Sequence, residues 1–358
     1  MSSAVYNFPG VYVQENAVPG LAIASSSTAV PVFAHDKSLI KQEQMIRIES
    51  WLDFMKLVPQ EPESPPAENK LYLALEAFFL CGGGMAYLCP TDKLMELVPQ
   101  YDDVTLLVAA GEDIASAVNT LCVENRFLFG VLDSVQPLSG DPEADMTAYT
   151  PTNYAAVYGP WLIKPKVESL VPPSGAVAGL YAATDRSRGV WKAPANVPLT
   201  GGLTPSQRFS EAKQGLYNVH DKPLNLFRAF TGVGPLLWGA RTLSSDAVQW
   251  RYVPVRRLFN TVERDISRAL RTMMFEPNHQ PTWEKVRAAV DNYLYALWQQ
   301  GALLGTNATE AYFVRVGLGV TMTQEDIDAG RLIVEVGLNA VRPVEFIILR
   351  FTQDIATV

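Results

Sequence analysis

Three continuous apolar runs, two of them separated by a stretch with helical spacing, constrain the fold of this 358-residue chain most strongly. They are residues 105–110, 127–133 and 154–158. Runs of this kind predict β-strands that are covered on both faces, as in parallel sheets. Residues 113–122, between the first two runs, repeat apolar side chains at the spacing of a helix. This alternation of strand and helix predicts an open α/β sheet.

The region before these runs continues the same pattern. Residues 21–23 and 28–33 read as short strands. Residues 70–80 have helical spacing and stop at Gly82-Gly83-Gly84, which is a normal glycine exit from a helix. Residues 85–89 then predict another strand. We expect all of these elements to join the α/β region.

A further helix is expected after the apolar runs. Residues 171–182 begin with two prolines and continue with small side chains, which is typical of a helix N-terminus that packs closely against a neighbour. Ser174 is the candidate cap of this helix. Residues 225–243 are apolar and contain glycine, and they predict one or two further strands.

The last hundred residues predict two helices and three strands. Asn260 with Glu263 resembles a capping box, which places a helix over residues 261–275. A second helix, with a wide apolar stripe, starts near Pro281 and stops at Gly301. The strands are expected at residues 311–316, 332–338 and 345–351. This part of the chain therefore has an α+β pattern.

Composition excludes several classes of protein. Hydrophobic content of 48% and charged content of 18% are ordinary for a globular protein, and the length allows one large domain or two. A net charge of -8 argues against nucleic acid as a partner. The start of the chain lacks a signal-peptide pattern, and no apolar stretch is long enough to span a bilayer. We therefore expect a protein made in the reducing cytoplasm, with Cys81, Cys89 and Cys122 as buried, reduced thiols.

No motif in the chain indicates catalysis. The three histidines are far apart, and a serine triad written with His220 and Asp185 lacks a nucleophile elbow. The glycines at 82–84 and 231–235 match neither a phosphate-binding loop nor a dinucleotide motif. The acidic pairs at 102–103 and 112–113 are more often a solvated rim than a cation site, so we expect no enzyme, metal or cofactor.

Both ends of the chain carry apolar, β-prone segments. Val11-Tyr12-Val13 lies between Pro9-Gly10 and Pro19-Gly20 in an otherwise loop-like stretch, and residues 344–351 form an apolar run near the other end. An unpaired strand is a liability in a monomer, because its free edge promotes association. The two ends therefore predict pairing with copies of the same chain. The alternative is that both ends join the sheet of their own subunit.

Motifs in order along nearly the whole chain resemble contractile tail sheath proteins. They are Phe8-Pro9-Gly10-Val11-Tyr12-Val13-Gln14-Glu15, the runs 177–186 and 189–196, Phe275-Glu276-Pro277-Asn278 with Thr282-Trp283, residues 297–305, and residues 342–347. The resemblance is nearest to sheath subunits of extracellular contractile injection systems of the antifeeding-prophage type. It extends to the sheaths of phage tails and contractile bacteriocins.

This resemblance implies a structural role. In the family, hexameric rings of sheath subunits stack helically around an inner tube, and contraction triggered at the baseplate drives the tube through a target envelope. The middle domain of the family is subtilisin-like in shape, and extended N- and C-terminal arms pair with the C-terminal domains of neighbours. The implied partners are further copies of the chain, the inner tube, the baseplate, a tail terminator and sister sheath proteins, in a particle that is released from the cell.

The resemblance also divides the chain and assigns candidate residues. The expected parts are an N-terminal arm at 1–20, an α/β region at 21–245, a C-terminal sheath domain at 246–341 and a strand arm at 342–358. The arm strands are Val11, Tyr12 and Val13 with Phe346, Ile347, Ile348 and Leu349. The tube-facing candidates are Arg264, Arg268, Arg271 and Lys285, although an ordinary solvated helix face explains the arginines equally well. The competing readings are an α/β hydrolase-like enzyme and a non-contractile tube or shell protein.

Overall fold

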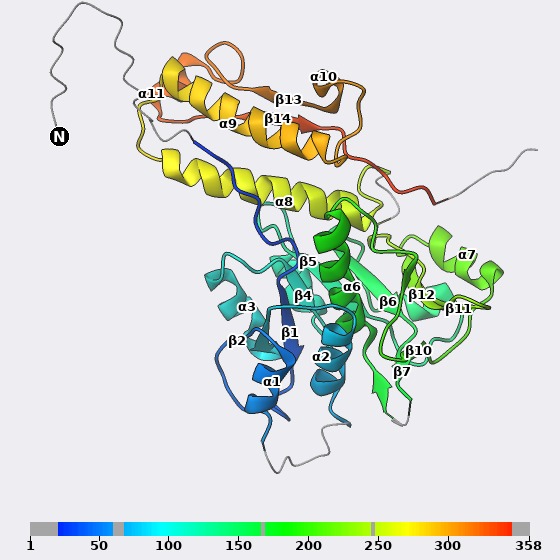
Figure 1. Ribbon diagram of the computed structural model, residues 1–358. Coiled ribbons are helices and arrows are strands. Elements are labelled where there is room, and N and C mark those ends of the chain that lie inside the picture. Colours follow the sequence, from blue (N-terminus) through cyan, green and yellow to red (C-terminus); the bar gives the residue numbers. More distant parts are fainter. Residues whose placement is uncertain (1–20, 60–67, 166–168, 245–247, 346–358) are drawn as a thin grey trace, which may run out of the picture.

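The computed structural model describes residues 21–59, 68–165, 169–244 and 248–345. Figure 1 shows a large twisted sheet flanked by helices, with two long helices and a small sheet stacked across one end of it. This arrangement confirms the predicted α/β class. Among the described residues, no helix combines the length and the apolar character needed to cross a bilayer.

The large sheet has nine strands in the order β2-β3-β1-β4-β5-β6-β11-β12-β9. The strands are β1 (Pro31–His35), β2 (Ile46–Ile48), β3 (Ala86–Pro90), β4 (Leu106–Val108), β5 (Phe129–Asp133), β6 (Ala155–Gly159), β9 (Val197–Pro198), β11 (Leu224–Phe230) and β12 (Gly234–Leu237). The strands from β3 to β11 are parallel to one another, whereas the pairs β2–β3, β11–β12 and β12–β9 are antiparallel. The three apolar runs that predicted buried strands are β4, β5 and β6.

Helices cover both faces of this sheet. On one face lie α1 (Trp51–Leu57), α2 (Lys70–Leu80) and α6 (Pro173–Arg188), whose side chains share a core with Phe33 of β1. On the other face, α3 (Leu94–Leu97), α4 (Ala115–Leu121) and α7 (Glu211–Val219) contribute side chains to a core with Val32 of the same strand. Because neighbouring residues of a strand point to opposite faces, β1 is buried on both sides. The three free cysteines are buried, as predicted.

Close contact between α2 and α6 explains the small side chains of residues 171–182. A Cβ atom added at Gly175 would lie 2.2 Å from the carbonyl oxygen of Ala74, and one at Gly179 would lie 2.4 Å from that of Phe78. The two helices therefore pack backbone against backbone. The predicted cap is wrong: Pro172 is the N-cap, and Ser174 lies inside the helix, where its hydroxyl donates to the Asp133 carboxylate.

The strand predicted at residues 21–23 is also wrong, because these residues have no regular secondary structure. Leu21 and Ile23 instead pack against the core of the C-terminal layer. Their apolar side chains are partly buried by tertiary packing rather than by pairing in a sheet. Apolar alternation over so few residues does not distinguish these two cases.

The C-terminal layer contains α8 (Val253–Leu270), α9 (Gln280–Gln299), β13 (Tyr312–Arg315) and β14 (Glu335–Leu338). The start predicted for the first helix of this layer, at residue 261, is wrong. It begins at Val253 with a proline in its first turn, so Asn260 is in mid-helix, and Glu263 pairs with Arg256 instead of capping. The Asn260 side chain is buried, accepts from Arg256 and donates to the carbonyl of Leu128. The second helix and its stop at Gly301 are confirmed.

Short elements complete the described structure. They are β7 (Leu162–Ile163), β8 (Leu170–Val171) and β10 (Thr204–Pro205), which form a three-stranded sheet, with α5 (Pro142–Asp145), α10 (Ala308–Ala311) and α11 (Gln324–Asp328). The predicted strands at 311–316 and 332–338 are β13 and β14. The strand predicted at 345–351 lies outside the described residues except for Glu345.

Candidate inter-subunit joint

The segment 25–28 leads to β1 and lies across α8 (Figure 1). Buried polar side chains of α8 hold it there. The Ser26 N–H donates to Asp265 Oδ2 (3.3 Å), and its hydroxyl donates to the same carboxylate. Arg264 Nη2 donates to Ser26 Oγ (2.6 Å) and to the carbonyl of Ser27 (2.7 Å). Tyr293 of α9 donates to Asp265 from the other side (2.9 Å). We call residues 25–28 the N-terminal root.

A second set of bonds continues the N-terminal root into the large sheet region. Asp185 of α6 accepts from Thr28 Oγ1 (2.5 Å) and forms an ion pair with Arg257 of α8 (2.6 Å). The Arg257 side chain is 3% exposed and that of Asp185 is 5% exposed, and the Arg257 guanidinium lies 4.4 Å from the centre of the Tyr181 ring. Arg257 also donates to the carbonyl of Thr28 (3.1 Å). A buried charge that loses its partner lowers the free energy of unfolding. This network therefore fixes the position of the N-terminal root relative to α6 and α8.

Burial shifts the pKa values of side chains that hold the N-terminal root. It lowers the pKa of the Arg264 guanidinium, while the neighbouring Asp265 acts in the opposite direction. It also raises the pKa of Tyr293, in the same sense as the charge of Asp265. These groups therefore form a permanent ion-pair and hydrogen-bond network rather than a site of proton transfer at neutral pH.

The other end of the described chain is held in a similar way. Arg241, whose side chain is 10% exposed, forms two bonds with the Glu345 carboxylate, Nε to Oε1 (2.8 Å) and Nη2 to Oε2 (2.7 Å). Tyr252 donates its hydroxyl to Glu345 Oε2 (2.9 Å). The remaining arginine nitrogen, Nη1, donates to the carbonyl of Asn218. We call Glu345 with these partners the C-terminal root.

Within the described residues, the small sheet of β13 and β14 has an unpaired outer edge. Tyr312 pairs with Leu338, and the ladder continues through a bond from the Asn339 N–H to the Ala311 carbonyl (2.8 Å). Hydrogen-bonded and non-bonded pairs alternate in an antiparallel ladder, so the peptide groups of Val336 and Leu338 face away from β13. Residues 302–304 pair with Asn339 and Val341 on the β13 side. Among the described backbone bonds, none covers the outer edge of β14.

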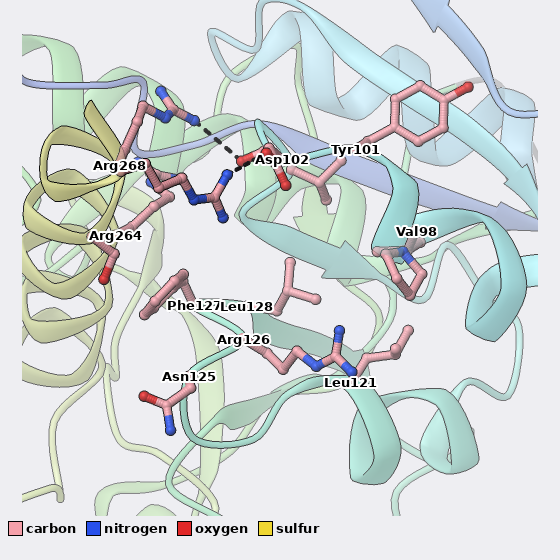
Figure 2. Close-up of a pocket in the computed structure, with 14 residues that line it drawn as sticks. Val98, Tyr101, Asp102, Leu121, Asn125, Arg126, Phe127, Leu128, Arg264 and Arg268 are labelled. Atoms are coloured by element: carbon pink, nitrogen blue, oxygen red, sulfur yellow. Dashed lines mark hydrogen bonds and ion pairs between the residues drawn. The ribbon is translucent and has the colours of Figure 1, made fainter. Parts of the chain in front are cut away.

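The arginines predicted to face a tube lie at the seam between α8 and the large sheet region. Figure 2 shows Arg264 and Arg268 beside Asp102 and the segment 125–128. Arg264 is 5% exposed and occupied by the N-terminal root. Arg268 donates to the Asp102 carbonyl (3.2 Å), and Arg271 pairs with the Asp102 carboxylate (2.9 Å) with both side chains mostly exposed. Lys285 is exposed on α9.

The structure does not bring the residues of a serine triad together. Asp185 is held by Arg257, whereas His220 lies 3.2 Å from Glu143. Asp133 accepts from Ser174 and from the Gly111 N–H, and burial raises its pKa to about 6. The described residues hold no group of three or more His, Cys, Asp or Glu side chains placed to bind a metal ion.

The predicted arm residues, Val11 to Val13 and Phe346 to Leu349, lie outside the described residues. The residues that hold the two roots were missed by the sequence reasoning. Their one visible signal is Arg257, a basic residue four positions before the expected start of this helix at residue 261. The structure thus describes residues 25–28, which follow the predicted N-terminal arm, and Glu345 of the predicted C-terminal arm, and the arms themselves stay predictions.

Comparison with known proteins identifies the class. The model of the phage tail sheath protein central domain matches residues 85–243, and that of the phage tail sheath C-terminal domain matches residues 245–354. The chain belongs to the phage tail sheath family.

Solved structures and curated relatives agree with this family. The chain is 51% identical to the sheath of an extracellular contractile injection system (PVC) in the contracted state, with a TM-score of 0.89 over 98% of this chain and 99% of that one. It is 41% identical to the contracted helical sheath of the anti-feeding prophage (AFP), with a TM-score of 0.81 over 98% of this chain and 100% of that one. The predicted resemblance to sheath subunits of contractile injection systems is confirmed.

Curated phage proteins are more distant. The tail sheath protein of Vibrio phage KVP40 is 27% identical over 187 residues, which are 51% of this chain and 26% of that protein. The tail sheath protein of Enterobacteria phage T4 is 26% identical over 187 residues, which are 52% of this chain and 27% of that protein. The chain therefore spans about a quarter of the length of these relatives.

Proposed function

We propose that this chain polymerises as stacked hexameric rings around an inner tube and that the resulting sheath contracts to drive the tube through a target envelope. The observation that carries this proposal is the full-length similarity to a sheath complex in its contracted state. The free energy for contraction resides in the lattice of subunits, and no nucleotide is needed. Contacts with the baseplate, a tail terminator and sister sheath proteins belong to the same proposal.

The arms supply the joints between subunits in this proposal. An extended segment that adds to a free strand edge gains main-chain hydrogen bonds and side-chain pockets. The outer edge of β14 is such an acceptor, and the segments 1–20 and 342–358 are the donors. The α/β region 21–245 and the C-terminal domain 246–341 form the body to which both arms are attached. The two roots give each arm a fixed starting point, so the arms, rather than the body, absorb the movement between rings.

The tube contact is assigned to exposed cations of the C-terminal layer. Arg268, Arg271 and Lys285 remain candidates because their side chains reach solvent, whereas the guanidinium of Arg264 already serves the N-terminal root. Exposed charge pairs contribute about 0–1 kcal/mol each, which suits a contact that must break during contraction. The bond between Arg271 and Asp102 is a competitor for that contact.

Deletion of residues 1–20 tests the arm mechanism. The truncated chain should remain folded and soluble, because it keeps the N-terminal root and all three hydrophobic cores of the described residues. It should fail to form sheath, since each subunit has lost one of its two joints. Negative-stain electron microscopy of full-length and truncated chains gives the readout, and a thermal melt of each confirms folding. Formation of ordered sheath by the truncated chain would contradict the arm mechanism.

A further inference from the structure

The turn between α8 and α9 presents two large apolar side chains to solvent. Met274 is 65% exposed and Phe275 is 102% exposed, the largest exposure among the described large apolar residues. Phe275 also has a φ of 72°, a left-handed conformation that is unfavourable for an aromatic residue. An isolated chain gains nothing by holding an aromatic ring in this position. We call Met274 and Phe275 the knob.

The knob is held on a rigid support. Asn278 accepts from the indole of Trp283 (2.7 Å) and donates to the carbonyl of Arg331 (3.0 Å), which ties the turn to α9 and to the segment after α11. Backbone bonds from the Met274 N–H to the Arg271 carbonyl and from the Glu276 N–H to the Met273 carbonyl close the turn. A preorganised apolar side chain loses little conformational entropy when it binds a partner.

An open cleft of ≈ 1340 Å³ lies at the opposite end of the same two helices. Its lining includes Tyr252, the N-cap of α8, and Gln300, the C-cap of α9. The knob instead follows the end of α8 and precedes the start of α9 (Figure 1). The 20-residue length of α9 separates the two features by about 30 Å. Neither can reach the other within one molecule.

The cleft has the chemistry to receive the knob. Aromatic and small residues, Trp191, Ala195, Trp238 and Ala240, provide its apolar surface, and Trp238 is 37% exposed. Its cationic residues are Arg188, Lys192, Arg228 and Arg342, whereas its acidic residues are Glu211 and Glu345. Arg241 already binds Glu345, so positive charge is in excess. Glu276, which is exposed beside the knob, supplies the opposite charge.

We propose that the knob of one subunit inserts into this cleft of a second copy of the chain. A knob and a cleft at opposite ends make a head-to-tail contact, which generates rings or helical filaments instead of closed dimers. The inference rests on the proposed sheath function and adds a side-chain contact to the strand pairing of the arms. The cleft also includes the C-terminal root, so the same face that releases the C-terminal arm receives the neighbour's knob.

The substitution Phe275→Asn separates this contact from a role in folding. Asn tolerates the left-handed conformation better than Phe, so the monomer should melt at the same or a higher temperature. Loss of a central aromatic contact should lower the association constant between subunits about 30-fold. Sedimentation velocity across a concentration series measures this constant. Leu52→Asn on α1 is the matched control, because Leu52 is 67% exposed and lies away from both features.

Cysteine cross-linking tests the partner surface directly. The three native cysteines are buried, so a mixture of Phe275→Cys and Ala195→Cys chains carries one reactive thiol on each. A short bis-maleimide should join the two variants during assembly, whereas a mixture of Leu52→Cys and Ala195→Cys chains should stay unjoined. Assembly of Phe275→Asn at the wild-type constant, or absence of the knob-to-cleft product, overturns the contact and leaves the sheath proposal standing. Failure of the wild-type chain to assemble overturns both.

Discussion

The two main sheets of this molecule differ in how completely a single chain covers them. The nine-stranded sheet has helices on both faces and ends in very short edge strands, β2 and β9. The two-stranded sheet packs one face on the core with α9, and no other described strand pairs with the outer edge of β14. Edge strands that are short or covered prevent association, whereas an open edge invites it. We therefore expect the large sheet to serve folding and the small sheet to serve assembly.

This contrast predicts that substitutions in the two regions have different consequences. Changes in the large sheet region or at its seam with α8 should lower the free energy of unfolding of the monomer. Changes on the open edge of the small sheet should leave the monomer intact and abolish the lattice. The predictions below run from the largest to the smallest expected effect on the monomer.

The buried pair of Arg257 and Asp185 gives the largest effect. Arg257→Ala leaves the Asp185 carboxylate buried without its partner, which typically costs about 3–5 kcal/mol. The midpoint of urea unfolding should fall accordingly. Arg271→Ala is the control, since the exposed pair with Asp102 contributes about 0–1 kcal/mol. Equal losses for the two variants would contradict the distinction between the buried and exposed parts of the seam.

His35, at the end of β1, makes the stability of the large sheet depend on pH. Burial lowers its pKa from 6.5 to about 4 in the folded chain. Between these values the unfolded chain binds a proton that the folded chain does not, so stability is full above pH 6.5 and falls as the pH drops towards 4. The shift corresponds to about 3 kcal/mol.

The measurement is the free energy of unfolding as a function of pH for the wild type and for His35→Gln. The variant should lose the part of the acid destabilisation that comes from this imidazole, and the exposed His279→Gln should retain it. A wild-type profile that stays flat between pH 7 and pH 4 would refute the assignment. Assembly at neutral pH is expected to be the same for all three chains.

Sequence reasoning succeeded where structure follows from local pattern. The strands β4, β5 and β6 were predicted because fully buried parallel strands are continuous apolar runs. The start of α8 was missed because Asn260 and Glu263 have the spacing of a capping box. Tertiary contacts instead place both residues inside a longer helix. The Arg256 guanidinium lies over the Trp250 ring, and the Asn260 amide donates to the carbonyl of Leu128.

The two roots were only partly predictable for a related reason. The apolar ends of the chain indicated arms, but the bonds that root the N-terminal arm join Ser26 to Asp265 across 239 residues. No local pattern contains such a contact. The helical spacing of Arg264, Arg268 and Arg271 predicted that they share one side of a helix; Arg264 and Arg268 lie on α8, whereas Arg271 lies in the 3-10 turn after it, and the spacing carried no information about what that side faces. The structure shows that it faces the seam.

Electron microscopy of the Val336→Pro chain tests most directly whether a neighbour's arm adds to β14. Proline removes an N–H group that points outward, and edge strands accept proline at such positions. The monomer should melt like the wild type but form no sheath. The matched variant Glu335→Pro removes an N–H group on the β13 side and should destabilise the small sheet itself. Wild-type sheath from Val336→Pro would contradict the account.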